Sequence, residues 1–242
     1  MPVISFLMSK PAEFPIPEKY KELLTKVREK QLKLASEISL EPRMSFGDIH
    51  TIAGLDVAFS EKEDHACAGI VTIDSRSFEV LDEQVAYFNP PIPYIPTFLH
   101  YREAPGYHKL MDQLNEKPDV LIFDGNGILH PFGIGIASQM GIEFNMPSFG
   151  IAKKLLLGEF NDRLQLGGFS NIIHNETRIG IAFQSYAHPA NPIYASPGHL
   201  IDFRTVVNIL REFHLNQKYP SKLPLPLAMA DKLVREKIEF GI

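Results

Sequence analysis

The sequence predicts an α/β fold in which one mixed β-sheet is flanked by helices. Two observations predict it. Residues 49–88 contain three strand-like segments in succession, and from residue 97 onward segments with helical spacing alternate with short apolar segments. A chain of 242 residues that is 45% hydrophobic can bury a substantial core. Because no shift in composition divides the chain, we expect a single domain over residues 1–242.

The first element is a charged, amphipathic helix. Residues 18–36 read EKYKELLTKVREKQLKLAS and follow a proline-rich lead. Apolar residues recur at helical spacing, and a proline-rich lead is a common way into a helix. We expect this N-terminal helix, at about residues 17–37, to pack on the rest of the domain.

Three strands follow the helix. The segments IHTIAGLDVAFS, CAGIVTID and FEVLDEQVAYF are rich in apolar and β-branched residues. The turn formers Asp74 and Ser75 separate the second from the third. We expect these strands to form an antiparallel meander.

The remaining elements alternate between helix and strand. We expect helices near residues 97–114, 135–141, 203–213 and 227–237, and strands at 120–123, at 148–152 and near Ile172 and Ile181. Val120 to Phe123 is apolar throughout, which is typical of a parallel strand buried on both faces. Three antiparallel strands followed by parallel ones, with helices on the faces, is the order of elements in ribonuclease-H-like folds.

Two aspartates stand in apolar strands. Asp56 lies inside AGLDVAFS, and Asp124 ends the buried strand immediately before Gly125-Asn126-Gly127. If the two strands are neighbours, both carboxylates approach one point, where they repel by about 1 to 4 kcal/mol at 4 Å. A cation between them would remove that repulsion, and oxygen-only ligands suit Mg²⁺, with Mn²⁺ as an alternative. An aspartate of this kind, taken alone, is more often a turn former or a helix cap, and it is the presence of two in the same apolar setting that makes a metal site an equal alternative.

A third segment adds an acidic residue. Asn89 to Pro105, NPPIPYIPTFLHYREAP, contains five prolines, which stiffen the chain and present Tyr94 on a rigid loop. Glu103 follows in the first turns of the next helix. It could serve the helix dipole, pair with Arg102, or be a third metal ligand.

Taken together, six segments resemble the endonuclease V family: AGLDVAFS, PYIPTFLHYREAP, LIFDGNGILHP, GIAS, PSFGIAKKLLLG and PIYASPGHLID. They occur in the family's order and span Ala53 to Asp202. The resemblance implies a metal-dependent endonuclease that cuts DNA or RNA near deaminated bases, principally inosine, in nucleic-acid repair.

The resemblance also implies roles for individual residues. Asp56, Glu103 and Asp124 match the family's metal-binding carboxylates. His199 matches a catalytic histidine, and Lys153 matches a lysine near the scissile phosphate.

The substrate contacts carry over in the same way. Tyr94 and Pro96, in PYIP, match an aromatic wedge inserted where the base leaves the stack. Gly125 and Gly127 match a loop whose backbone forms part of the pocket for the extruded base. Exposed backbone amides near Gly125-Asn126-Gly127 are candidates for reading the edge of that base.

The chain departs from the family pattern at three single positions, and the segment IAFQSYAHPA lacks an arginine that is often found there. Thr97 stands where a glycine is usual, Phe132 replaces an arginine, and Gln139 replaces a histidine. None is a predicted metal ligand. We therefore expect retained catalysis with an altered grip on the substrate. The net charge of −5 points the same way, because a large phosphate footprint normally requires a basic surface.

Two other functions fit the same residues. One is a protein that binds inosine-containing nucleic acid with weak or lost cleavage, and the other is a phosphohydrolase of small nucleotides. The Tyr94 wedge favours a polymer, because a mononucleotide leaves no stack to fill. The single cysteine, Cys67, fits a reducing compartment, and the N-terminus has no basic region ahead of an apolar run. No apolar run reaches membrane-spanning length. We therefore expect a cytoplasmic protein without a membrane partner, and we expect it to be a monomer.

Overall fold

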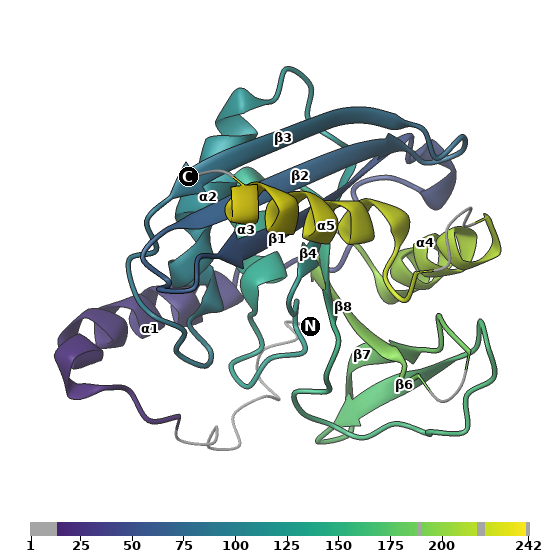
Figure 1. The fold of residues 1–242 in the computed structure, drawn as a ribbon. Coiled ribbons are helices and arrows are strands. Elements are labelled where there is room, and N and C mark those ends of the chain that lie inside the picture. The colour runs from purple at the N-terminus through teal and green to yellow at the C-terminus, as the bar shows by residue number, and fades with distance from the viewer. Residues whose placement is uncertain (1–13, 188–189, 217–220, 241–242) are drawn as a thin grey trace.

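One eight-stranded mixed sheet organises the protein, with strand order β3-β2-β1-β4-β5-β8-β7-β6 (Figure 1). It is seen in a computed structural model that describes residues 14–187, 190–216 and 221–240. The expectation about a signal sequence rests largely on residues 1–13, which lie outside the described residues. The strands are β1 (Thr51–Phe59), β2 (Ala66–Asp74), β3 (Val80–Phe88), β4 (Val120–Asp124), β5 (Ser148–Ala152), β6 (Phe169–His174), β7 (Thr177–Phe183) and β8 (Ile193–His199).

Helices lie on both faces of this sheet. They are α1 (Lys21–Ala35), α2 (Leu99–Gln113), α3 (Ile136–Phe144), α4 (Phe203–Asn216) and α5 (Leu225–Phe240), with short 3₁₀ turns at Glu18–Tyr20 and Phe46–Asp48. Within the described part of the chain, no helix has the length and apolarity that a membrane span requires. The predicted mixed α/β architecture is confirmed.

The strand pairing follows the prediction over the first five strands. β1, β2 and β3 pair antiparallel, and β1, β4 and β5 pair parallel. Beyond β5 the sheet becomes antiparallel again, because β8 runs against both β5 and β7, and β7 pairs with β6. The neighbouring position of β1 and β4, on which the predicted convergence of the two aspartates depends, is therefore present.

β8 is the element that the sequence analysis missed. It contains Pro197 and Gly198, which are uncommon inside strands and which favoured a turn. Pro197 lies opposite Phe149 beside an irregularity of the β5–β8 register, and its carbonyl accepts a hydrogen bond from the Ile128 amide at 2.8 Å. A proline at such an irregularity is tolerated, since the missing N–H leaves no regular ladder position unpaired.

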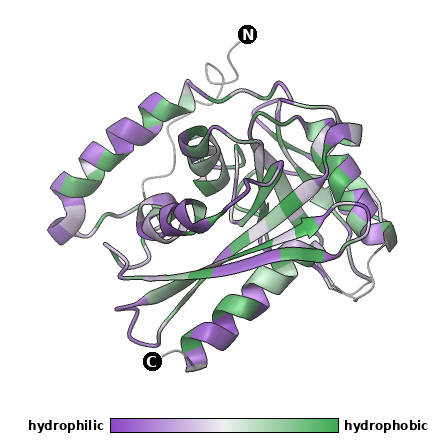
Figure 2. Cartoon of the chain, turned by 90° about the horizontal axis from the view of Figure 1, so that it is seen from above, coloured by the Kyte–Doolittle hydropathy of each residue, from purple (hydrophilic) through white to green (hydrophobic). Residues whose placement is uncertain are grey.

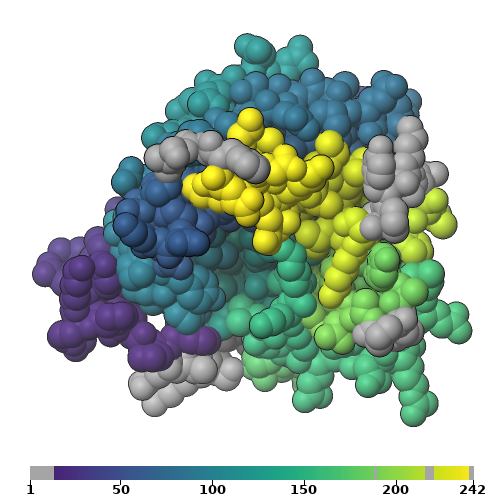
Figure 3. All heavy atoms as spheres, in the orientation of Figure 1, coloured from purple at the N-terminus to yellow at the C-terminus, as the bar shows by residue number. Residues whose placement is uncertain are grey.

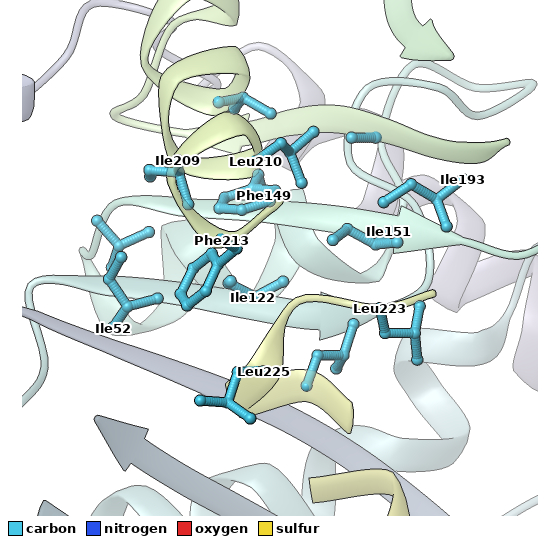
Figure 4. Packing of buried hydrophobic residues seen from close by; sticks show 14 of the residues in the cluster. Ile52, Ile122, Phe149, Ile151, Ile193, Ile209, Leu210, Phe213, Leu223 and Leu225 are labelled. Carbon is cyan, nitrogen blue, oxygen red and sulfur yellow. The ribbon is translucent and has the colours of Figure 1, made fainter. Parts of the chain in front are cut away.

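The two faces of the sheet explain why its central strands are apolar throughout. Ile52 and Ile122 point toward α4 and α5, where they join Phe149, Ile209 and other side chains of the largest hydrophobic cluster (Figure 4). The alternate residues Leu121 and Phe123 point the other way, toward α2 and α3. Both sets of side chains are buried, as expected of strands covered on both sides.

The N-terminal helix lies at the periphery. Figure 2 shows hydrophilic and hydrophobic residues alternating along α1, whereas hydrophobic residues predominate in the centre of the molecule. Leu24 of α1 is buried together with Ile92, Ile95 and Phe98 from the loop between β3 and α2. The helix therefore packs on the proline-rich loop that carries Tyr94.

Candidate active site

Asp56 and Asp124 lie at adjacent strand ends on the same face of the sheet. Leu55 of β1 is opposite Phe123 of β4, so the residue that follows each lies side by side with the other. Because side chains alternate along a strand, Asp56 shares the face of Ile52, and Asp124 shares that of Ile122. Both carboxylates therefore point toward the side of the sheet that α4 and α5 cover.

A third carboxylate comes from α5. Oxygen atoms of Asp56, Asp124 and Asp231 all lie within 4.8 Å of one another. Two glycines allow this helix to approach so closely: a Cβ on Gly54 would lie 2.3 Å from the Leu227 backbone nitrogen, and one on Gly69 would lie 2.5 Å from a Val234 side-chain carbon. Asp231 was not identified from the sequence. The available signal was its position four residues after Leu227 and three before Val234, on the buried side of the helix.

Lys153 occupies the edge of this cluster. Its Nζ lies 2.8 Å from Asp124 Oδ2 and 3.3 Å from Asp231 Oδ1. Burial would lower the pKa of Lys153, but the carboxylates of Asp124 and Asp231 outweigh it and raise the pKa. The predicted lysine is thus in contact with two acidic groups and carries the positive charge that the cluster requires.

Asp231 is held from its own helix as well. Arg235, one turn later on α5, donates from Nε to Oδ2 at 3.0 Å and from Nη2 to Oδ1 at 3.1 Å. Burial opposes ionisation of Asp231, but the hydrogen bonds from Arg235 and Lys153 lower its pKa. The carboxylate is therefore ionised and oriented by two cations.

Glu103 approaches the cluster from α2 on the other side of the sheet. Its side chain is buried and accepts a hydrogen bond from the Tyr107 hydroxyl at 3.1 Å. Burial, and next the charge of Asp56, raise the pKa of Glu103 well above its usual range. Arg102 pairs with Glu63 at 3.2 Å and stacks on Phe59. Glu103 is thus close enough to interact with the cluster, but it is not one of the three carboxylates that converge within 4.8 Å.

The electrostatics of the cluster favour a bound cation. Burial, and then the neighbouring charge of Asp124, raise the pKa of Asp56 to about 8. A carboxyl with such a pKa holds its proton near neutrality unless positive charge is added. Three converging carboxylates supply only oxygen donors, which is the ligand set that Mg²⁺ and Mn²⁺ prefer. The residues present therefore fit a divalent metal ion.

The surface around the cluster is hollowed. A groove of about 670 Å³ is lined by Asp56 and the following residues of β1, by Asp124 and Lys153, and by α5 from Asp231 to Glu239. Figure 3 shows this recess beneath α5. The acidic cluster is therefore open to a ligand from solvent.

The glycine turn after Asp124 is sterically required. Gly125 has φ +142°, where a Cβ would also lie 2.5 Å from an Ile136 methyl carbon, and a Cβ on Gly127 would lie 2.0 Å from the Pro197 carbonyl oxygen. The amides of both glycines are already engaged: Gly125 donates to the Ile151 carbonyl and Gly127 to the Ser196 hydroxyl, each at 2.9 Å. Of the amides in this turn, those of Gly125 and Gly127 are therefore used within the protein.

The Tyr94 loop forms one wall of a second, smaller cavity. Tyr94 is 63% exposed. It lines a cavity of about 120 Å³ together with Pro96, Asn126, His130 and other residues. Within the described residues, the buried Asn126 Oδ1 has no hydrogen-bond partner. The wedge residues and the turn after Asp124 are thus brought together as expected, with the Asn126 side chain as the unsatisfied polar group.

His199 is not brought together with the carboxylates. It ends β8 opposite Ser148, the first residue of β5, whereas Asp124 lies opposite Ile151, near the other end of β5. Its Nδ1 accepts a hydrogen bond from the Ser39 amide at 3.2 Å, and burial lowers its pKa. Its strand runs antiparallel to β5, which carries the histidine away from the site.

Comparisons with known proteins point to one family. The family model described as Endonuclease V matches residues 32–232. An endonuclease V of Thermofilum pendens is 35% identical over 215 residues, covering 89% of this chain and 88% of that protein. One of Dictyoglomus thermophilum is 33% identical over 216 residues, covering 88% and 92%.

Solved structures of the same family have the same fold. The catalytic domain of human endonuclease V superposes with a TM-score of 0.80 at 27% identity, covering 93% of this chain and 98% of that one. An endonuclease V from Bacillus subtilis gives 0.80 at 28% identity, covering 94% and 95%. Since the family model and these relatives extend over most of its length, the chain belongs to the endonuclease V family.

Proposed function

We propose that this protein hydrolyses a phosphodiester bond near inosine in a nucleic-acid strand, with a divalent metal ion held by Asp56, Asp124 and Asp231. Membership of the endonuclease V family supports a nuclease. The observation that carries the assignment of the site is the convergence of three carboxylates from β1, β4 and α5 within 4.8 Å, beside Lys153 and in an open groove.

Each residue has a distinct part in the proposed reaction. A bound Mg²⁺ or Mn²⁺ would polarise the phosphate and favour a hydroxide nucleophile. Asp56, Asp124 and Asp231 would hold it, and Glu103 would add a proton acceptor or donor beneath the cluster. Lys153, which lies 2.8 Å from Asp124 at the edge of the cluster, would donate to a phosphate oxygen.

Base recognition is assigned to the smaller cavity. Extruding a base leaves a gap in the stack, and the exposed ring of Tyr94, supported by Pro96, can fill it. The Asn126 side chain, whose Oδ1 is buried and without a partner in the described structure, can accept a hydrogen bond from the base. A sea-squirt (Ciona intestinalis) endonuclease V has been crystallised with DNA containing an inosine followed by a ribo-adenosine, at 22% identity to this chain. This supports inosine as the first base to test.

The test is cleavage of matched strands. DNA and RNA of one sequence, with and without a single inosine, are incubated with the protein in Mg²⁺, in Mn²⁺ and in EDTA. The proposal predicts nicking near inosine in either metal and none in EDTA. Asp124→Asn is expected to abolish nicking, whereas Asp112→Asn, at an exposed position of α2, is expected to leave it unchanged.

The other outcomes separate the alternatives. Binding without nicking would indicate a recognition protein. Hydrolysis of free nucleotides with no strand cleavage, and with little dependence on salt, would indicate a small-nucleotide phosphohydrolase. Elution of the purified protein on gel filtration would test the expected monomer, and a cytoplasmic location stays a prediction.

A further inference from the structure

Thr97 has an unusual backbone conformation beside the Tyr94 loop. Its φ is +71°, in the left-handed region that β-branched residues rarely adopt. Such a conformation persists only where surrounding contacts hold it. In this protein the contacts come from helix α1.

Two side chains of α1 hold Thr97. Arg28 donates from Nη2 to the Thr97 hydroxyl, and Gln31 donates from Nε2 to the Thr97 carbonyl at 3.3 Å. Arg28 also donates to the Gln31 side-chain oxygen, which fixes the two donors relative to each other. The buried contact of Leu24 with the same loop keeps the helix in place.

The same two side chains reach a second loop. The Arg28 guanidinium contacts two aromatic rings, with its Cζ 4.2 Å from the Phe98 centroid and 3.6 Å from that of Phe132. Gln31 Nε2 donates to the Ile134 carbonyl at 3.1 Å. Arg28 and Gln31 thus connect the loop of residues 94–98 to the loop of residues 130–135.

These two loops are walls of the small cavity. Tyr94, Pro96 and Thr97 line it from one loop, and His130 and Gly135 from the other. Their separation determines what fits between them. Burial, and then the charge of Arg28, lower the pKa of His130 to about 3, so the wall it forms is neutral.

We propose that Arg28 and Gln31 are positioning residues that fix the width of the base cavity by holding Thr97 against the loop of Phe132. Thr97 and Phe132, two of the positions at which the chain departs from the family pattern, are then linked through α1. Arg28 contacts both the Thr97 hydroxyl and the Phe132 ring. This inference rests on the proposed function for its consequence in cleavage, but not for the arrangement of the loops.

The loop can be observed without any substrate. The chain contains no tryptophan, so Tyr94→Trp provides a single emitter at the loop. In that background, Arg28→Ala is expected to increase quenching by acrylamide and to lower the fluorescence anisotropy. Lys30→Ala, an exposed lysine on the same helix, is the matched control and is expected to change neither. Equal signals from the two variants would overturn the proposal.

Cleavage of an inosine strand supplies the second measurement. It uses the protein with its natural Tyr94, without the tryptophan. Arg28→Ala is expected to raise KM for an inosine strand about tenfold, the effect of one hydrogen bond from a charged donor, with little change in kcat. Arg28→Lys keeps the charge but loses the planar stacking, and should restore only part of the loss. A fall in kcat with KM unchanged would contradict a positioning role.

A double-mutant cycle guards against simple unfolding. Thr97→Gly removes the hydroxyl, and glycine adopts the left-handed conformation freely while α1 keeps its apolar contacts. Arg28→Ala should then have a smaller effect in the Thr97→Gly background than alone. Additive effects would overturn the coupling. If the parent protein does not cut inosine strands, the proposed function fails while the fluorescence result still decides whether α1 holds the loop.

Discussion

Lys153 and Asp124 form an ion pair with 2.8 Å between Nζ and Oδ2, at the edge of the acidic cluster. The same ammonium group lies 3.3 Å from Asp231 Oδ1. A metal ion held by these carboxylates, as proposed above, would compete with Lys153 for them.

This competition predicts that Lys153→Ala changes both the nicking rate and the Mg²⁺ requirement. The nicking rate at saturating Mg²⁺ should fall by about 10- to 100-fold, because a positive contact to the phosphate is lost. The Mg²⁺ concentration for half-maximal rate should also fall, because the competing ammonium is gone. A Mg²⁺ titration of the rate checks both, with Lys154→Ala, the neighbouring exposed lysine, as control. A higher requirement for Mg²⁺ would show that Lys153 assists metal binding instead.

Asp231 should be as important as the two strand aspartates. Asp231→Asn keeps the size of the side chain and one acceptor oxygen but removes the charge, and we expect the nicking rate to fall by about 100-fold or more. Arg235→Ala leaves the carboxylate in place and should have a smaller effect. Single-turnover rates at saturating Mg²⁺ provide the measurement. Activity near that of the parent in Asp231→Asn would remove α5 from the site.

The raised pKa of Asp56 predicts how stability varies with pH in EDTA. Its folded pKa of about 8 lies above the usual 3.8, so the folded state holds a proton that the unfolded state has lost. The free energy of unfolding should therefore fall as pH rises from about 4 to about 8. Asp56→Asn should therefore raise Tm more at pH 8 than at pH 5, because most of the loss develops between these two pH values. Thermal unfolding at both pH values tests this, and equal shifts would contradict it.

Gly127 predicts a steric effect. In Gly127→Ala the new methyl would lie 2.0 Å from the Pro197 carbonyl oxygen, so backbone must move. We expect the free energy of unfolding to fall by about 1–3 kcal/mol or more. Gly47→Ala is the control, because a Cβ there has nothing within 4 Å. Urea denaturation of the two variants provides the comparison, and similar midpoints would mean that the turn accommodates a side chain.

The sequence predicted those parts of the protein that depend on local patterns. The strand containing Asp56 and the strand ending in Asp124 followed from apolar periodicity. Their pairing was a condition of the predicted convergence, and the structure supplies it. β8 was missed because Pro197 and Gly198 are local signals for a turn, and only the pairing with β5 and β7 overrides them.

The site residues divide in the same way. Asp124 was marked by the glycines that follow it, and Lys153 by its segment. No local sequence pattern identified Asp231, because its place in the cluster depends on where α5 packs. That packing depends in turn on Gly54 and Gly69. His199 was selected from a short motif, although its strand runs away from the carboxylates. Packing between distant segments, which periodicity does not encode, decides both cases.

The close approach of α5 to Gly54 also has a consequence for the order of events during synthesis. A ribosome makes β1 early, but the third carboxylate belongs to the last helix of the described chain. A chain made only as far as β8 contains Asp56 and Asp124 but lacks Asp231. The proposed set of three carboxylates is therefore complete only after α5 has been made and has packed on the sheet.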